Sequence, residues 1–196
     1  MQFARVPVWG WPIIAVVIIA GVAWLVWSLW FDAYHLATVQ AGVLYRDGVR
    51  TLREFQTTVR IVKPRTVVCL VDDTEIVHSP FTDEVTYCRQ NNIDLVRIPV
   101  TLGGWPQGEQ IRQFLSITTD PARRPVLVHC AQGVRRTGMM VAAYQESVLG
   151  YDAARAKQSM LTFGHSQRTV GDIQRFVDVY DPVARSMTRE LPRSTE

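Results

Sequence analysis

The sequence contains little cysteine: three residues, Cys69, Cys88 and Cys130, in a chain of 196. Their spacing matches no disulfide framework, and an odd number leaves at least one thiol unpaired in a monomer. The sequence therefore gives no indication of a small secreted domain held together by disulfides. At least one thiol is available for chemistry.

Strong charge of one sign is also missing. The formal net charge is +3 and the arginines are scattered, which argues against a nucleic-acid partner. Internal repeats and low-complexity tracts are absent as well, which argues against repeat architectures and disordered arrays. A hydrophobic fraction of 47% and a charged fraction of 20% are typical of a globular chain. The length leaves room for one ordinary domain and a short additional segment.

No charged residue occurs between Trp11 and Phe31. A run of about 20 apolar residues matches the ~30 Å hydrocarbon core of a bilayer, and tryptophans near both ends resemble an aromatic belt. The alternatives are a buried core helix, which seldom lacks a polar face, and a cleaved signal peptide, whose apolar region is shorter. The sequence thus predicts an N-terminal tail at residues 1–10 and one transmembrane helix at residues 11–31.

The charges that flank this segment do not determine its orientation, because Arg5 precedes it while Arg46 and Arg50 follow it. A reducing cytoplasm suits a reactive thiolate better than an oxidising compartment. We therefore expect a single-pass membrane protein whose catalytic domain, residues 32–181, lies in the cytoplasm. Residues 182–196 are polar and are expected to form a flexible tail.

After the apolar segment, β-branched runs alternate with helical patterns. Strands are predicted at residues 65–71, 93–100 and 124–130. Helices are predicted around Leu52, Phe55 and Val59, and at residues 79–92, 109–119, 137–149, 152–164 and 169–181. This alternation predicts an α/β fold with a mostly parallel central sheet flanked by helices.

Ligands of such sheets bind beyond the carboxyl ends of the strands. Cys130 follows one predicted strand, Asp72 and Asp73 follow another, and the Gly103-Gly104 loop follows the third. Three loops that are distant in the sequence are therefore expected to converge on one rim of the sheet.

The loop after Cys130 has the composition of an anion site. Gly133 permits a turn in which successive backbone N–H groups point at one centre, and the following helix adds its positive end. Arg136 supplies a planar fork of donors for two phosphate oxygens. These positive groups lower the pKa of Cys130 and make it a nucleophilic thiolate, whose sulfur the Thr137 hydroxyl can bind. The alternative for Cys130 is a buried structural thiol.

The segment "HCAQGVRRTG" resembles the H-C-x5-R-[ST]-G motif of the cysteine-dependent protein tyrosine and dual-specificity phosphatases, and the layout after residue 31 is similar to their compact bacterial members. The resemblance implies a phosphocysteine intermediate on Cys130, with no metal and no other cofactor. His129 would buttress the loop. The expected catalytic residues are Cys130, Arg136 and Thr137, and the expected phosphate-binding residues are Ala131, Gln132, Gly133, Val134, Arg135 and Arg136.

The chain departs from this family in one respect. Members usually carry a general-acid aspartate on the loop after the preceding strand, whereas residues 101–110, "TLGGWPQGEQ", contain none. Asp94 lies at the wrong end of its strand. The candidate acids are Asp73, with its neighbour Asp72, and Glu109. The alternatives are an exposed turn for the aspartates and a charge in the first helical turn for Glu109.

We therefore predict a phosphatase that hydrolyses phosphate monoesters, of the phosphotyrosine or dual-specificity type. The missing aspartate leaves open a preference for good leaving groups, or a membrane-tethered pseudophosphatase that only binds phosphate. Arg135, if it does not simply face solvent, favours a polyanionic substrate such as an inositol phosphate or a phosphoinositide. The expected partners are a phosphorylated protein or such a phospholipid or inositol phosphate, and the membrane.

Two further alternatives remain open from the sequence. Rhodanese-like sulfurtransferases also place a cysteine loop on an α/β scaffold, but their loop usually lacks the Thr-Gly pair after the arginine. Oxidation could also join Cys130 to Cys69 or Cys88, since a low-pKa thiol is readily oxidised. The competing interpretation places Cys69 in a core strand and Cys88 on a helix.

Overall fold

The computed structural model describes residues 10–31 and 33–184 of the chain. At its centre is a five-stranded sheet in the order β1-β2-β5-β3-β4. The strands are β1 (Ala37–Gln40), β2 (Leu44–Gly48), β3 (Thr66–Cys69), β4 (Asp94–Arg97) and β5 (Val126–Cys130). Because β5 is the middle strand, Cys130 lies at the centre of the sheet edge.

The predicted α/β class with flanking helices is confirmed, but the description of the sheet as mostly parallel is wrong. The sheet is mixed: β2, β5, β3 and β4 run parallel to their neighbours, whereas the edge strand β1 pairs antiparallel with β2. Only residues 41–43 join these two strands. A connection this short reverses the chain and permits only antiparallel pairing.

Neither β1 nor β2 was predicted from the sequence. In β2, Arg46 and Asp47 interrupt the apolar pattern, and a buried strand seldom contains two charged residues in succession. Both side chains are nevertheless buried, with exposed fractions of 2% and 0%. Arg46 is buried against the loop after Cys130, whereas the Asp47 carboxylate lies near Thr58 and His129. Local sequence reveals neither set of contacts.

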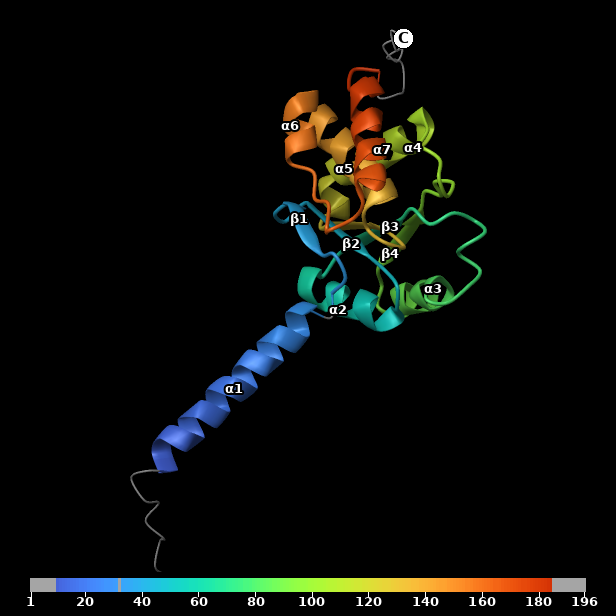
Figure 1. The fold of residues 1–196 in the computed structure, drawn as a ribbon. Coiled ribbons are helices and arrows are strands. Elements are labelled where there is room, and N and C mark those ends of the chain that lie inside the picture. Colours follow the sequence, from blue (N-terminus) through green and yellow to red (C-terminus); the bar gives the residue numbers. More distant parts are fainter. Residues whose placement is uncertain (1–9, 32, 185–196) are drawn as a thin grey trace, which may run out of the picture.

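Helices cover both faces of the sheet (Figure 1). On one face lie α2 (Leu52–Val62) and α3 (Phe81–Gln90). On the other lie α4 (Gly108–Thr119), α5 (Arg135–Ser147), α6 (Ala153–Gln158) and α7 (Gln167–Val179). A short 3-10 helix, Pro121–Arg123, precedes β5.

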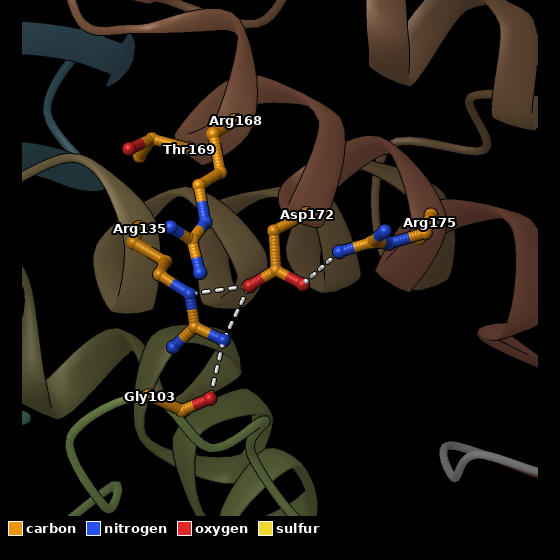
Figure 2. A pocket seen from close by; sticks show the side chains of 6 residues that line it. All are labelled: Gly103, Arg135, Arg168, Thr169, Asp172 and Arg175. Atoms are coloured by element: carbon orange, nitrogen blue, oxygen red, sulfur yellow. Dashed lines mark hydrogen bonds and ion pairs between the residues drawn. The ribbon is translucent and has the colours of Figure 1, made fainter.

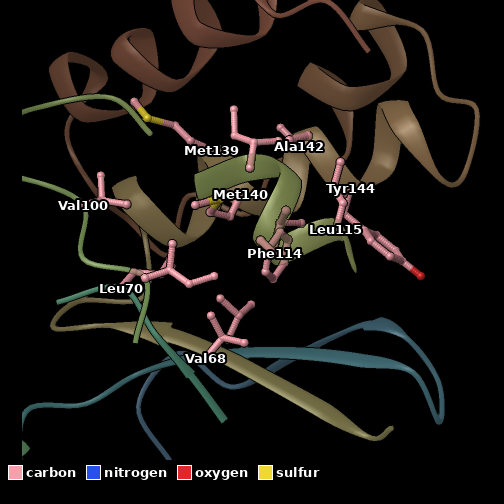
Figure 3. Packing of buried hydrophobic residues seen from close by; sticks show 14 of the residues in the cluster. Val68, Leu70, Val100, Phe114, Leu115, Met139, Met140, Ala142 and Tyr144 are labelled. Carbon is pink, nitrogen blue, oxygen red and sulfur yellow. The ribbon is translucent and has the colours of Figure 1, made fainter. Parts of the chain in front are cut away.

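Each face of the sheet has its own hydrophobic core, because successive strand residues point to opposite faces. Val68, Leu70 and Cys130 belong to the larger core, which Phe114 and Met140 complete under α4 and α5 (Figure 3). The smaller core, under α2 and α3, is formed by residues that include Phe55, Val67, Cys69, Cys88 and Leu127. Burial of each large apolar side chain stabilises the fold by about 2 kcal/mol.

The apolar N-terminal segment forms the helix α1 (Gly10–Phe31). Among the described residues, no helix has both the length and the apolarity needed to cross a membrane. The prediction of a single-pass membrane protein is therefore corrected. The predicted tails at 1–10 and 182–196 lie almost entirely outside the described residues.

Candidate active site

The loop between β5 and α5 is packed tightly against β2. Gly133 has φ 66°, and a Cβ at this position would lie 2.3 Å from the carbonyl oxygen of Asp47. Only glycine fits, because both its conformation and its contact exclude a side chain. From the other side, Arg46 donates from Nη2 to the carbonyl oxygen of Gly133 at 2.6 Å. These contacts fix the loop as a rigid cradle above the strand end.

The Cys130 thiol lies at the bottom of this cradle, with 2% of its surface exposed. The Gly133 N–H donates to its sulfur at 3.2 Å. Burial raises the pKa of Cys130, but the Arg136 cation, the Thr137 hydroxyl and the N–H groups of Thr137 and Gly133 outweigh burial and lower it. The site thus favours the thiolate form of Cys130, which is the nucleophilic form of a cysteine.

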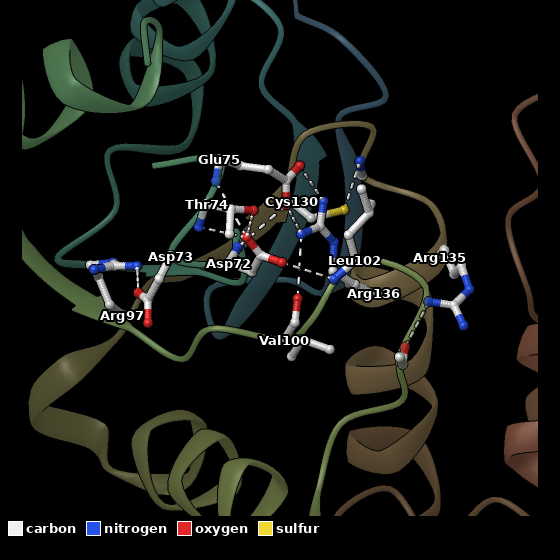
Figure 4. Close-up of polar contacts among 12 residues, drawn as sticks. Asp72, Asp73, Thr74, Glu75, Arg97, Val100, Leu102, Cys130, Arg135 and Arg136 are labelled. Carbon is white, nitrogen blue, oxygen red and sulfur yellow. Dashed lines mark hydrogen bonds and ion pairs between the residues drawn. The ribbon is translucent and has the colours of Figure 1, made fainter. Parts of the chain in front are cut away.

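Arg136 makes its main contacts with a residue that the sequence analysis did not select. Its Nη1 and Nη2 donate to the two carboxylate oxygens of Glu75, at 2.5 and 3.0 Å (Figure 4). The Arg136 side chain is only 6% exposed and that of Glu75 is 22% exposed. A paired fork of this kind is among the strongest polar contacts in proteins and fixes the guanidinium plane.

Asp72 holds the turn that carries Glu75. Its carboxylate accepts the Thr74 hydroxyl at 2.6 Å, the Thr74 N–H at 2.8 Å and, from a separate loop, the Leu102 N–H at 3.0 Å. The Thr74 hydroxyl and these N–H groups lower the pKa of Asp72 to about 2. An aspartate this acidic stays ionised at neutral pH, and its contacts tie the loop after β3 to the loop after β4.

A pocket of about 210 Å³ opens over the cradle. Its walls come from the loops that follow β3, β4 and β5 and from the first turns of α5 and α7. The residues that line it are Glu75, Leu102, Gly103, Cys130, Ala131, Gln132, Arg135, Arg136 and Thr169. The expected convergence of three loops on one rim is thus observed.

The structure brings together most of the predicted site residues. Cys130, Arg136, Ala131, Gln132 and Arg135 line the pocket. Gly133, Val134 and Thr137 are buried directly beneath it.

The two candidate acids lie elsewhere. Asp73 is 76% exposed and pairs with Arg97 at 2.6 Å, while Glu109 is 80% exposed and pairs with Arg112 at 2.7 Å. Neither lines the pocket. Asp94, which was set aside, pairs with Arg123 at 3.1 Å. Glu75 is the carboxylate that the pocket contains.

Arg135 does not simply face solvent. Its Nη1 and Nη2 donate to the carbonyl oxygens of Gly104 and Gly103, each at 2.7 Å, and its guanidinium pairs with Asp172 on α7. Arg135 therefore links α5, the loop after β4 and α7, and it presents a fixed cation at the edge of the pocket.

Under the strand end lies a buried network of polar side chains. His129 contacts Glu84 through Nε2 at 2.7 Å, and both are buried. Burial lowers the pKa of His129, but the adjacent Glu84 carboxylate outweighs burial and raises it well above its ordinary value. Asp47 pairs in register with His129 across β2 and β5, and burial raises its pKa to about 7. Cys69, Glu84 and His129 have ligand atoms within 4.8 Å of one another, and Glu84 and His129 bind each other directly.

The sheet separates the other cysteines from Cys130. Cys69 pairs in register with His129, and its side chain and that of Cys88 belong to the core on the α2 and α3 face. Cys130 belongs to the core on the opposite face. All three thiols are free. This arrangement supports the structural interpretation of Cys69 and Cys88 over oxidative pairing with Cys130.

The residues of this site that the sequence analysis missed include Glu75, Arg46 and His35. His35 contacts the Gln132 carbonyl oxygen through Nδ1 at 2.8 Å and stacks on Phe163, with ring centroids 4.3 Å apart. A signal existed only for Glu75, because it lies three residues after Asp72, at a strand end already assigned to the rim. Arg46 and His35 reach the loop from segments with no motif of their own.

Residues 61–177 match the family described as "DSP-PTPase phosphatase fused to NAD+ Kinase". The chain belongs to this family. It is therefore a phosphatase of the dual-specificity and tyrosine phosphatase superfamily, as the motif predicted. This membership also argues against the sulfurtransferase alternative.

Two curated relatives are plant proteins. "NAD kinase 2, chloroplastic" of Arabidopsis thaliana is 39% identical over 119 residues, which make up 59% of this chain and 11% of the relative. "Probable NAD kinase 2, chloroplastic" of Oryza sativa subsp. japonica is 36% identical over 56 residues, 29% of this chain and 6% of the relative. The chain thus spans a small part of the curated relatives it matches.

Solved phosphatase structures share the fold. The catalytic domain of the PP-IP phosphatase SIW14 from S. cerevisiae superimposes with a TM-score of 0.62 at 18% identity, over 76% of this chain and 86% of that chain. TpbA of P. aeruginosa gives a TM-score of 0.58 at 23% identity, over 73% and 83%. Tk-PTP in its active form gives 0.56 at 20% identity, over 73% and 96%.

Proposed function

We propose that this phosphatase hydrolyses phosphate monoesters of the phosphotyrosine or dual-specificity type through a phosphocysteine intermediate on Cys130. The observation that carries the proposal is the setting of this thiol. Its pKa is lowered, and it lies at the bottom of a pocket that Arg136 also lines. A thiol with a purely structural role requires neither a lowered pKa nor a neighbouring pocket.

In the first step, the Cys130 thiolate attacks the phosphorus of a monoester bound in the cradle. The P–S bond forms as the bond from phosphorus to the leaving oxygen breaks. Arg136 and the backbone N–H groups of the loop stabilise the charge on the equatorial oxygens. The leaving oxygen needs a proton unless the leaving group is already a good one.

Glu75 is the proposed proton donor. In the structure its carboxylate pairs with Arg136. A bound phosphate dianion competes for the same guanidinium, so Glu75 loses its cation and comes to lie beside a negative charge. Freed from Arg136, its carboxyl group lies within the pocket over Cys130, where it can supply the proton that the leaving oxygen needs.

In the second step, water attacks the phosphocysteine and the sulfur leaves as a thiolate. The groups that lower the pKa of Cys130 also stabilise this leaving group, and the Thr137 hydroxyl is among them. Glu75, now deprotonated, can accept the proton of the attacking water. Inorganic phosphate is released, and the free enzyme is restored without a metal in either step.

The test is turnover by the full chain and by Cys130→Ser. The substrates are p-nitrophenyl phosphate, a phosphotyrosyl peptide and an inositol phosphate. We expect wild type to release phosphate and Cys130→Ser to lose at least about a thousandfold in kcat, as for other nucleophile deletions. Binding of these compounds without turnover by wild type would instead identify a pseudophosphatase.

An inositol phosphate or phosphoinositide headgroup is the second candidate substrate class. Arg135 supports it, since its cation is fixed at the pocket edge by Asp172 and two carbonyl oxygens. One relative in fold, SIW14, is described as a PP-IP phosphatase. The same substrate panel distinguishes the two classes through kcat/KM for the peptide and for the inositol phosphate.

A further inference from the structure

A second pocket, of about 330 Å³, shares part of its lining with the pocket over Cys130. Figure 2 shows the residues that line this second pocket. Its lining residues are Gly103, Arg135, Arg168, Thr169, Asp172 and Arg175. Gly103, Arg135 and Thr169 line both pockets. A ligand that extends from the Cys130 site along this wall therefore enters a space with three arginines and one carboxylate.

The single carboxylate holds two of the arginines in place. Asp172 pairs with the guanidinium of Arg135 and accepts from Arg175 at 3.0 Å and from the indole N–H of Trp105 at 3.1 Å. Burial raises the pKa of Asp172, but these donors outweigh burial and lower it, so the carboxylate is ionised at neutral pH. Arg135 is thus a fixed cation, Arg175 is an exposed one, and Asp172 offsets their two charges only in part.

Arg168 differs from the other two. It lies in the first turn of α7 and is exposed, and within the described part of the chain it forms no hydrogen bond or ion pair. Figure 2 shows its side chain extending into the same space as that of Arg135. An unpaired guanidinium beside two partly neutralised ones gives the pocket a net positive charge, and a phosphate is the ligand that such a group of donors binds best.

We propose that this pocket is a second anion subsite, which binds a second phosphate group of the substrate while the scissile phosphate lies over Cys130. The preferred substrate is then a small phosphate monoester that carries another phosphate on the same molecule. Arg168 is the main ligand of the second phosphate, and Arg135 stands between the two groups. The inference rests on the proposed function and narrows its substrate class.

The inference is tested by binding, so that the result does not depend on turnover. Isothermal titration calorimetry on the full chain, in a Cys130→Ser background, compares adenosine 2′-monophosphate with adenosine 2′,5′-bisphosphate at constant ionic strength. The two ligands share the 2′-ester and differ only in the second phosphate. We expect the bisphosphate to bind about tenfold more tightly, as one charge-assisted contact at a partly exposed site provides.

Arg168→Gln should reduce this preference to less than about twofold, since it removes the unpaired cation. The matched control is Arg89→Gln, which removes an exposed arginine from α3 on the other face of the sheet and should keep the tenfold preference. Equal affinities for the two ligands in the Cys130→Ser protein, or a preference that survives Arg168→Gln, would overturn the subsite. By contrast, if the wild-type protein turns over none of the substrates, only the proposed function is overturned.

Discussion

The carboxylate of Glu75 and the guanidinium of Arg136 face each other through two hydrogen bonds, at 2.5 and 3.0 Å. Glu75 lies in the loop after β3 and Arg136 in the first turn of α5, 61 residues apart in the sequence, and both line the pocket above Cys130. The pair joins the proposed phosphate-binding residue to the one carboxylate among the lining residues of that pocket. Its opening by bound phosphate is the step that couples substrate binding to proton transfer in the proposed mechanism.

The first prediction concerns Glu75→Gln. If Glu75 protonates the leaving oxygen, the variant should lose about a hundredfold in kcat with phenyl phosphate, whose leaving group is poor. It should lose much less with p-nitrophenyl phosphate. The pH profile of kcat should also differ between Glu75→Gln and wild type. Steady-state kinetics from pH 5 to 9 measure both effects.

Asp73→Asn and Glu109→Gln are the matched controls for this experiment, because each removes one exposed carboxylate, Asp73 from the loop after β3 and Glu109 from the first turn of α4. Both should keep the wild-type pH profile. If the pH profile changes in either control but not in Glu75→Gln, the general acid is Asp73 or Glu109, as selected from the sequence.

The second prediction concerns the Thr137 hydroxyl, which helps to lower the pKa of Cys130. Thr137→Ala should slow the breakdown of the phosphocysteine, because the sulfur becomes a poorer leaving group. Rapid-quench kinetics with p-nitrophenyl phosphate should then show a burst of nitrophenol followed by a slow steady rate. Thr137→Ser keeps the hydroxyl and should behave like wild type. A burst of equal size in both variants would show that the hydroxyl is not the cause.

The third prediction compares two glycines with positive φ, Gly133 at 66° and Gly150 at 69°. A Cβ at Gly150 meets nothing within 4 Å, whereas one at Gly133 meets the backbone of Asp47. Gly150→Ala should therefore destabilise by about 1 kcal/mol, for conformation alone. Gly133→Ala should cost about 1–3 kcal/mol more, because the loop or β2 must move. Urea denaturation measures both, and equal losses would contradict the tight contact between the loop and β2.

The fourth prediction is a pH dependence of stability that originates at Asp47. Burial raises the pKa of Asp47 from 3.8 to about 7, so the folded state binds a proton that the unfolded state has released between these values. Stability should therefore fall as the pH rises from about 4 to 7, by on the order of 4 kcal/mol. The raised pKa of His129 acts in the same direction, since its proton is also lost as the pH rises.

Asp47→Asn keeps the shape of the neutral side chain and should flatten this dependence. Thermal denaturation at pH 5, 6, 7 and 8 provides the comparison, with the exposed Asp94→Asn as the control. If Asp47→Asn and wild type lose stability in parallel over this range, Asp47 is not the titrating group.

Much of the site could be predicted from one short segment, because its chemistry is local. The strand that ends at Cys130, the turn at Gly133 and the arginine at 136 are consecutive in the sequence, so their spacing alone indicates a phosphate cradle. The α/β class followed in the same way from the alternation of β-branched runs with amphipathic ones.

What the sequence did not reveal depends on contacts between distant segments. Arg46 and Asp47 have the charge of a surface strand, yet β2 is an inner strand in which Arg46 is buried against the Gly133 loop and Asp47 near Thr58 and His129. Glu75 reaches Arg136 because Asp72 anchors its turn to the Leu102 N–H, a contact without a sequence motif. The contact of Arg135 with a carboxylate on α7 was missed for the same reason. From the sequence, Arg135 was expected to face either substrate or solvent.

The central claim is that Cys130 carries the phosphoryl group during turnover, and trapping the intermediate tests it most directly. The full chain is mixed with p-nitrophenyl phosphate, quenched in acid within milliseconds, digested and analysed by mass spectrometry. We predict one added phosphoryl group on the peptide that contains Cys130, absent from Cys130→Ser and more abundant in Thr137→Ala. Steady turnover with no phosphoryl group on that peptide, or undiminished turnover by Cys130→Ser, would contradict the account.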